Sequence, residues 1–192
     1  MPLRVGKFAL AVLLFVALLV CFPVVVVPTP SMERTVLVGD HLLVNRLAFC
    51  WRGIRRGDVV SFHPPTQTND VYLKRVIATG GDTVEFRGDR VMVNGIELRE
   101  PYARYIGADE PEASKVTVPA GELYVLGDNR NQSEDSRYWG TVPEKNVVGA
   151  PVMVLWSFAA PTREWLSESP AAVYLNRPLA HIRWARFFHS ID

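Results

Sequence analysis

Cysteine and histidine are scarce in this sequence, and their scarcity restricts what the chain can be. The 192 residues include two cysteines and four histidines. Cys21 lies inside an apolar run and Cys50 lies well outside it, so we expect no disulfide between them. The histidines are scattered and form no HExxH pattern, which leaves little from which to build a zinc site. The sequence therefore predicts a fold without disulfides or a bound metal.

Neither basic nor acidic side chains are in clear surplus over the other. The chain has 21 basic and 20 acidic side chains, for a formal net charge of +1. Nucleic-acid-binding domains usually carry a clear basic surplus. We therefore expect no nucleic-acid partner.

Charge is absent altogether from one long segment near the N-terminus. Phe8 to Val27 is an uncharged run of 20 residues, and as a helix at about 1.5 Å per residue it would span a bilayer core of roughly 30 Å. Arg4 and Lys7 precede it, which favours a cytoplasmic N-terminus. We predict a cytoplasmic segment at 1–7, a transmembrane anchor at 8–27 and an exported domain at 28–192. A cleaved secretory signal is the alternative, but the run is long and no Ala-x-Ala site follows it.

The exported part reads as an all-β, mainly antiparallel domain, because short apolar runs recur between turn signals and long helical periodicity is absent. Asn94-Gly95 favours a type I′ hairpin turn. Residues 100–116 contain a predicted variable loop or insertion. The predicted strands are His41–Phe49, Asp58–His63, Val71–Thr79, Thr83–Phe86, Arg90–Val93, Ile96–Leu98, Glu122–Leu126 and Val147–Phe158.

The C-terminal tail, residues 176–192, interleaves basic and aromatic side chains. Such a segment could rest on a membrane surface as a short helix. It could equally pack its aromatic side chains on the β domain. The second alternative is favoured, because amphipathic assignments from short segments are often wrong.

Ser31 lies four residues beyond the apolar run, between Pro30 and Met32. A nucleophile at this position would meet substrates that are inserted in the membrane. A serine after prolines is, by itself, more often a turn residue than a nucleophile. Ser31 therefore needs an activating partner before it becomes a catalytic candidate.

Lys74 is the candidate partner. Strand alternation places Tyr72, Lys74 and Val76 on one face and Leu73, Arg75 and Ile77 on the other. Burial among apolar neighbours would lower the pKa of the Lys74 amine, as a general base for a serine hydroxyl requires. A strand lysine that reaches out to water is the alternative. A third polar stretch, Gly127 to Gly140, carries hydroxyl, carboxylate and guanidinium groups that could brace such a site.

These motifs, in this order, resemble those of the bacterial type I signal peptidases. The resemblance covers residues 27–150, and the loop at 100–116 and the tail carry little of it. The matching segments are Pro28-Thr29-Pro30-Ser31-Met32 with Gly39-Asp40, Tyr72-Leu73-Lys74-Arg75 with Gly80-Gly81-Asp82, and Gly127-Asp128-Asn129-Arg130 with Ser133, Asp135, Ser136 and Arg137.

The resemblance implies a role for each matched residue. Ser31 would be the acyl-forming nucleophile and Lys74 its general base. The hydroxyl of Thr29 would complete an oxyanion hole with the amide N–H of Ser31, and Ser133 would hydrogen-bond the lysine amine. Met32 would pack near substrate side chains. Supporting ion-pair positions would be Arg75, Asp128, Asp135 and Arg137.

Two positions depart from the family pattern. Arg34 stands where the family usually has proline before Thr35, and Pro30 stands where many members have glycine. Neither change removes a reactive group, so we expect them to affect the local geometry and substrate preference more than activity.

The resemblance further implies a fold like that of signal peptidases and LexA-type proteases, and an activity. The expected enzyme is a membrane-bound serine endopeptidase without a cofactor, which removes N-terminal signal peptides from exported preproteins. It would be a single-pass monomer of the bacterial inner (cytoplasmic) membrane, in contact with lipid, with its catalytic domain on the exported side. Substrates would carry small residues at the first and third positions before the cut.

Three alternatives stay open at the level of sequence. A self-cleaving Ser/Lys protease of the LexA type is disfavoured by the apolar anchor and by the lack of a DNA-binding segment. A Ser/His/Asp hydrolase that uses His41 or His63 is disfavoured because no G-x-S-x-G motif surrounds Ser31. The third alternative is an inactive membrane-anchored scaffold that binds signal peptides, and the presence of both Ser31 and Lys74 argues against it.

Overall fold

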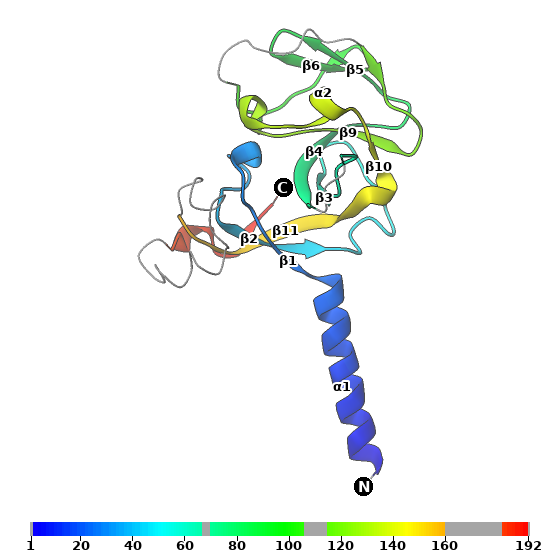
Figure 1. Ribbon diagram of the computed structural model, residues 1–192, viewed down its shortest axis with the longest axis vertical. Coiled ribbons are helices and arrows are strands. Elements are labelled where there is room, and N and C mark those ends of the chain that lie inside the picture. The colour runs from blue at the N-terminus through cyan, green and yellow to red at the C-terminus, as the bar shows by residue number, and fades with distance from the viewer. Residues whose placement is uncertain (1, 67–69, 106–114, 160–181, 192) are drawn as a thin grey trace.

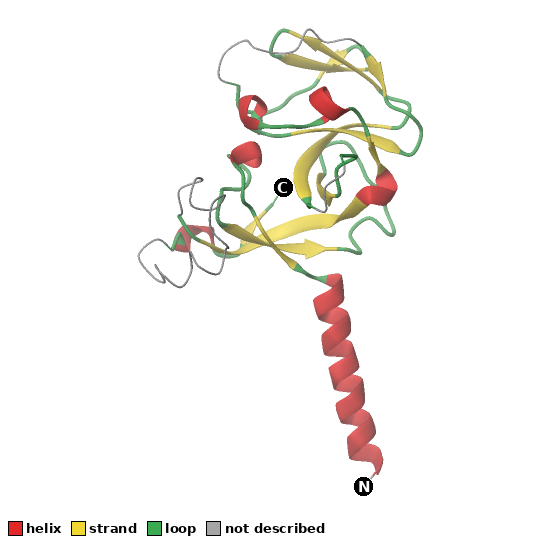
Figure 2. Ribbon diagram, in the orientation of Figure 1, coloured by secondary structure: helices red, strands yellow, loops and turns green. Residues whose placement is uncertain are grey.

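The computed structural model of the protein describes residues 2–66, 70–105, 115–159 and 182–191. A long helix, α1 (Pro2–Cys21), projects away from a body built of β-strands (Figure 1). The other helices of the described part are short pieces between strands (Figure 2). The prediction of a mainly antiparallel β domain is therefore confirmed.

The predicted transmembrane span, residues 8–27, is wrong at its C-terminal end. The helix stops at Cys21, and β1 (Val24–Val26) pairs with β2 (Asp40–Asn45). Pro23 lies at this change, where proline lacks the N–H that a continuing helix would need. Within the described residues, no helix meets the combined length and hydropathy expected of a membrane-crossing segment.

Two antiparallel sheets form the β body. The larger one has the order β1-β2-β11-β3-β4-β9-β10, with β12 beside β11, and the smaller one has the order β7-β6-β5-β8. The further strands of the larger sheet are β3 (Val59–Phe62), β4 (Tyr72–Thr79), β9 (Glu122–Leu126), β10 (Val142–Pro143), β11 (Val147–Ser157) and β12 (His189–Ser190). Those of the smaller sheet are β5 (Thr83–Arg87), β6 (Arg90–Val93), β7 (Ile96–Glu97) and β8 (Val116–Thr117).

Every predicted strand has a counterpart in the structure, and β6 and β9 match their predicted bounds. The hairpin turn between β6 and β7 is also confirmed, since Asn94 and Gly95 both have positive φ, 54° and 79°. The sequence reading missed β1, β8, β10 and β12. Each of these has only two or three residues, too few to show an alternation of apolar and polar side chains.

The core divides into three clusters of buried apolar side chains. One joins the two sheets through β4 and β9 on one side and β5 and β6 on the other. A second lies between β3, β4, β9 and β10. The third contains Met32 and Val36, next to Ser31 in the chain, together with Val154 of β11. Burial of such side chains contributes about 1.5–3 kcal/mol each, so the third cluster ties the segment around Ser31 to the sheet.

The described end of the tail, Ile182–Ile191, lies along β11. Ile182 bridges Phe158, and His189–Ser190 pairs with Met153 and Val154. This described end of the tail therefore packs on the β domain, as the favoured alternative predicted. The aromatic part of that prediction holds less well, because Trp184 and Phe188 are exposed. Residues 176–181, which belong to the same prediction, lie outside the described part.

Candidate active site

Ser31 sits in a 3-10 turn, Pro30–Met32, that follows β1. Thr29 before the turn is extended, with φ −125° and ψ 154°, and Pro30 occupies the first turn of the helix. Proline suits this position, because its fixed φ is already helical and the N–H that it lacks would have no partner there. The Pro30 departure from the family pattern is therefore compatible with the turn. Ser31 itself is 6% exposed.

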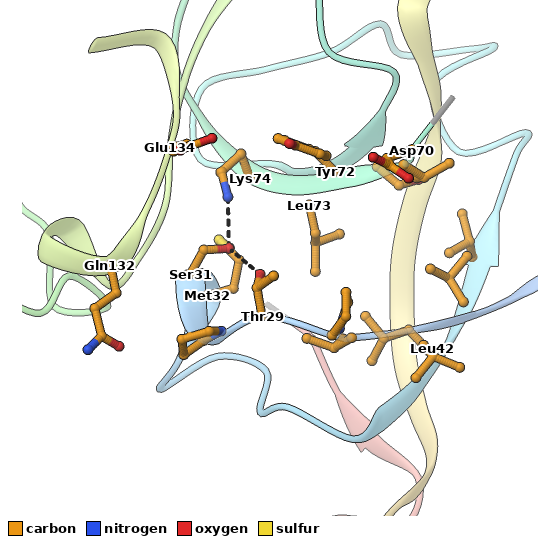
Figure 3. Close-up of a pocket in the computed structure, with 18 residues that line it drawn as sticks. Thr29, Ser31, Met32, Leu42, Asp70, Tyr72, Leu73, Lys74, Gln132 and Glu134 are labelled. Carbon is orange, nitrogen blue, oxygen red and sulfur yellow. Dashed lines mark hydrogen bonds between the residues drawn. The ribbon is translucent and has the colours of Figure 1, made fainter. Parts of the chain in front are cut away.

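Lys74 reaches Ser31 from near the start of β4. Its Nζ lies 2.7 Å from Oγ of Ser31, a hydrogen bond between residues 43 positions apart in the chain (Figure 3). Nζ also lies 5.7 Å from the centroid of the Tyr72 ring, on the face that strand alternation predicted. The Lys74 residue is 4% exposed. The alternative in which this lysine reaches out to water is excluded by that burial.

The environment of Lys74 favours its neutral amine. Burial lowers the pKa of Lys74 from 10.5 to about 8. The carboxylate of Asp135 raises the pKa against this effect, and the guanidinium of Arg137 lowers it. Desolvation is the largest contribution, because a charged ammonium loses its hydration in the protein interior. A substantial fraction of the amine is therefore free to accept a proton in mildly alkaline solution.

Thr29 is the second hydroxyl beside Ser31. Its Oγ1 lies 3.3 Å from Oγ of Ser31. In Figure 3 the side chains of Thr29 and Lys74 approach the serine hydroxyl from different sides. Three polar groups thus converge on one point: an amine, the Ser31 hydroxyl and a further hydroxyl.

The polar stretch after β9 forms a rigid frame around this point. Asp135 accepts hydrogen bonds from the backbone N–H of Gly127 at 3.0 Å and from Nε of Arg137 at 2.8 Å. It also precedes the short helix α2 (Ser136–Trp139) and accepts from the N–H of Arg137 at its N-terminus. Ser136 accepts from the N–H of Val125. The predicted Asp135–Arg137 ion pair is present in this frame.

A second buried ion pair joins β4 to the same stretch. Nε and Nη2 of Arg75 donate to the two carboxylate oxygens of Asp128 at 3.0 and 2.9 Å. Their side chains are 4% and 1% exposed. Thr35 donates to Asp128 at 2.5 Å, which extends the network to the turn after Ser31. Bidentate pairs of this kind fix geometry, and breaking one partner of a buried pair typically costs about 3–5 kcal/mol.

Ser133 does not form the predicted hydrogen bond with the amine of Lys74. Oγ of Ser133 is buried and has no hydrogen-bond partner in the described part of the chain. Ser133 instead packs against Gly127, where an added Cβ would overlap its side chain and lie 2.5 Å from the carbonyl oxygen of Ser31. Among the described residues, the Lys74 amine is thus placed by its hydrogen bond to Ser31, and Ser133 lies near the backbone of the nucleophile.

Met32 is 1% exposed, and its sulfur accepts a hydrogen bond from the N–H of Asp128 at 3.4 Å. It also lines a cleft of about 570 Å³ that opens beside Ser31 and Lys74. Apolar side chains from β1, β2, β4 and the segment Val27–Met32 contribute more than half of the lining, and Asp70, Gln132 and Glu134 add polar groups. The cleft is therefore suited to a ligand with apolar groups.

No histidine is among the residues that line this cleft. His41 stacks on the ring of Trp156, with centroids 4.8 Å apart. The ring of His63 contacts the carbonyl oxygen of Asp70 at 3.2 Å. The arrangement thus favours lysine over histidine as the partner of Ser31.

A segment that the sequence gave no reason to select, Glu100–Tyr105, completes the frame. The ring of Tyr102 lies 4.1 Å from the guanidinium carbon of Arg75. Glu100 forms a buried ion pair with Arg130. Arg104 donates its N–H to the carbonyl of Asp128 at 2.7 Å. The first residues of the predicted loop at 100–116 thus contact the site, Val116 belongs to β8, and 106–114 lie outside the described part.

Arg34 is the other position that departs from the family pattern. Arg34 has φ 102°, a left-handed conformation that proline cannot adopt. Its guanidinium donates to the carbonyl of Ala103 at 3.1 Å. Glu33 beside it forms an ion pair with Arg104 at 3.2 Å. The turn after the nucleophile is thus joined to the Glu100–Tyr105 segment.

The chain is similar to known proteins of one family. The chain matches the family model described as "Signal peptidase, peptidase S26" over residues 3–156. A signal peptidase I of Leptolyngbya laminosa is 38% identical over 137 residues, which cover 68% of this chain and 66% of that protein. The probable signal peptidase I-2 of a Synechocystis strain is 37% identical over 136 residues, covering 68% and 61%. The crystal structure of a signal peptidase I from Enterococcus faecalis V583 is 34% identical with a TM-score of 0.45, covering 52% of this chain and 97% of that one.

The family model and the two curated relatives assign the chain to the peptidases. More narrowly, the chain belongs to the signal peptidase family, peptidase S26. The matched part spans about two thirds or less of the length of the two curated relatives named here.

Proposed function

We propose that the chain is a signal peptidase, an endopeptidase that removes N-terminal signal peptides from exported preproteins through a covalent intermediate on Ser31. The observation that carries this proposal is the 2.7 Å contact between Nζ of Lys74 and Oγ of Ser31, both nearly buried. Family membership supports the substrate class.

Lys74 acts first as the general base. Its neutral amine takes the proton of the Ser31 hydroxyl while Oγ attacks the carbonyl carbon of the scissile peptide bond. The negative charge that develops on the carbonyl oxygen is stabilised by the amide N–H of Ser31 and the hydroxyl of Thr29. The C–N bond then breaks, the ammonium of Lys74 gives its proton to the leaving amine, and the signal peptide is held as an ester on Ser31.

A water molecule completes the cycle. Lys74 takes a proton from the water as its oxygen attacks the ester carbonyl, and the ammonium returns the proton to Oγ of Ser31 as the ester bond breaks. The products are the mature protein and a signal peptide with a free carboxylate. A single titratable amine thus serves both half-reactions, as histidine does in the commoner triads.

Thr29 provides a test of the oxyanion role. Thr29→Ser keeps the hydroxyl and is expected to keep most activity, whereas Thr29→Val keeps the shape and loses the hydrogen bond. Loss of one such donor typically lowers kcat by about 10²–10³. Comparable rates for Thr29→Val and the wild type would remove the hydroxyl from the mechanism.

The apolar N-terminal segment supports a membrane location. Large apolar side chains of α1 between Phe8 and Val20 are 46–73% exposed. Exposed apolar surface of this extent is unfavourable in water. We propose that α1 anchors the enzyme at the bacterial inner membrane, with a single pass, a cytoplasmic N-terminus and the β domain on the exported side, where it meets its substrates as a monomer. Alkaline carbonate extraction of membranes would leave an anchored chain in the pellet, and release of the chain would contradict anchoring.

The experiment that tests the proposed activity is cleavage of an Ala-x-Ala preprotein in detergent. Ser31→Ala and Lys74→Ala are both expected to abolish cleavage. Ser190→Ala and Lys145→Ala are matched controls at exposed positions and should leave the rate unchanged. Full activity in Lys74→Ala would reject the proposed base, and a folded wild type that cleaves nothing would favour a signal-peptide-binding scaffold.

A further inference from the structure

The described C-terminal segment, Ile182–Ile191, lies beyond the part of the chain that matches the family model, which ends at residue 156. It nevertheless makes contacts close to the candidate active site. The partners are the loop Thr35–Asp40, which follows the nucleophile turn, and the core cluster beneath Ser31.

Arg186 joins the two ends of that loop. Nε of Arg186 donates to the carboxylate oxygens of Asp40 at 3.0 and 3.1 Å, and Nη2 donates to Oδ2 at 2.6 Å. Nη2 also donates to the backbone carbonyl of Thr35 at 3.2 Å. Asp40 is fully buried and in turn accepts from the N–H of Leu37 at 2.8 Å. One guanidinium therefore holds the beginning and the end of the loop at a fixed separation.

The same loop contacts both sides of the nucleophile turn. The N–H of Val36 donates to the carbonyl of Met32 at 2.9 Å, and Val27 exchanges backbone hydrogen bonds with Gly39 and Asp40 at 2.9 Å each. Thr35 donates to Asp128, the partner of Arg75 in β4. A shift of the loop would thus move the chain that enters the turn and the chain that leaves it.

Ile191 provides a second connection. It packs against the core cluster that contains Met32, and Leu73 packs against the same cluster. Met32 adjoins Ser31 in the chain, and Leu73 adjoins Lys74. The N–H of Ile191 donates to the carbonyl of Val152 at 3.2 Å, which fixes the residue on β11.

We infer that Ile182–Ile191 is a strap that positions the nucleophile, and that Arg186 is a positioning residue for Ser31. The inference rests on the proposed function. Small displacements of reacting groups lower rates strongly, by about 10²-fold for about 1 Å. Arg186 touches neither reacting group, so its removal should slow the chemical steps and leave substrate binding in the cleft nearly unchanged.

The test uses the full chain in detergent and three readouts: kcat and KM for the Ala-x-Ala preprotein, the rate of acylation of Ser31 by a serine-reactive acylating probe, and thermal unfolding. Arg186→Met should lower kcat and the acylation rate by about 10-fold to 10²-fold, with KM within about threefold. Arg186→Lys keeps a charge opposite Asp40 and should recover part of the loss. Ile191→Ala is the milder second variant, should Arg186→Met fail to fold.

Two controls separate positioning from stability. Val91→Ala creates a cavity under the smaller sheet, at a fully buried residue, and should lower the unfolding temperature without changing kcat per folded molecule. Trp184→Ala changes an exposed side chain of the strap itself and should have little effect on any readout.

The outcomes are distinct. A fall in kcat and acylation rate for Arg186→Met and Ile191→Ala beyond that of Val91→Ala, with partial recovery in Arg186→Lys, supports the strap. Unchanged rates in folded Arg186→Met and Ile191→Ala overturn the strap and leave the proposed function intact. A wild type that neither cleaves the preprotein nor reacts with the probe overturns the proposed function and, with it, the positioning role.

Discussion

Lys74 and Arg75 are consecutive residues of β4 whose side chains enter two different networks. Lys74 contacts the hydroxyl of Ser31, whereas Arg75 pairs with the carboxylate of Asp128. Alternation along the strand separates the two cations. Among the described residues, Lys74 has no carboxylate in hydrogen-bond contact, and its pKa is lowered. Arg75 is held as a permanent charge in a bidentate pair with Asp128.

Activity should rise with pH through the pKa of Lys74. The base works as the neutral amine, so protonation below about pH 8 removes it, and kcat/KM should increase through that value and level off above it. The measurement is kcat/KM for the Ala-x-Ala preprotein across roughly pH 6 to 10, a range that includes the ordinary lysine pKa of about 10.4. A profile that levels off below pH 7 would point to a group other than Lys74.

Replacing Lys74 by methionine should stabilise the protein at neutral pH while it abolishes cleavage. The pKa is about 8 in the folded state and 10.5 ordinarily. Below pH 8 the lysine is protonated in both states, and the folded state carries the full cost of the buried charge. Between about pH 8 and pH 10.5 the unfolded chain binds more protons than the folded chain, so the stability of the wild type rises with pH. Lys74→Met should therefore gain up to about 3 kcal/mol at pH 7.

The stabilisation of Lys74→Met should shrink as the pH approaches 10.5, because the wild-type lysine is then neutral in both states. Urea unfolding at pH 7 and near pH 10 measures the difference. Lys145→Met, at an exposed position, is the control and should show little change at either pH. A Lys74→Met variant less stable than the wild type at pH 7 would mean that the bond to Ser31 outweighs the desolvation of the amine.

Gly127→Ala should inactivate the enzyme. The added Cβ would lie 2.5 Å from the carbonyl oxygen of Ser31 and would overlap the side chain of Ser133, so the nucleophile turn must shift. We expect kcat to fall by about 10²-fold or more. Gly80→Ala is the matched control, since its Cβ would come within 2.9 Å of the backbone at Pro119 and Ala120. Equal losses of kcat per folded molecule in both variants would contradict a site-specific effect.

Tyr102 should stabilise the site both through its ring and through its hydroxyl, which donates to Oε1 of Glu100 at 3.2 Å. The ring lies 4.1 Å from the guanidinium carbon of Arg75, and a desolvated cation–π contact contributes about 2 kcal/mol. Tyr102→Phe keeps the ring and loses the hydrogen bond to Glu100, so it should lose about 1.5 kcal/mol. Tyr102→Ala loses both contacts and should lose about 3 kcal/mol or more. Tyr138→Ala removes an exposed ring 5.7 Å from the guanidinium of Arg137 and should cost less. Similar losses of unfolding free energy for Tyr102→Ala and Tyr138→Ala would mean that Tyr102 contributes no more than an exposed ring.

Local patterns in the sequence were sufficient for the longer strands and for the face of β4 on which Lys74 lies. The Asn94-Gly95 turn and the alternation around Lys74 depend on neighbours within a few residues, and such local preferences are consistent with the fold. Motif order then identified Ser31 and Lys74 as partners, although 43 residues separate them. Pro23 allowed for an early end of the helix, but the predicted anchor ran on to Val27, because apolar character continues through Val24–Val26 while the backbone changes to a strand.

Tertiary structure added contacts around the pair that the sequence did not indicate. Ser133 has no bond to Lys74, and the ring of Tyr102 and the guanidinium of Arg186 reach the site from segments with no recognisable motif. These contacts join residues far apart in the chain, so no local spacing encodes them. The depressed pKa of Lys74 is decided in the same way, because desolvation depends on every segment that packs around the amine. The sequence by itself determined the reactive groups and their family, and the packing of distant segments determined their geometry and charge.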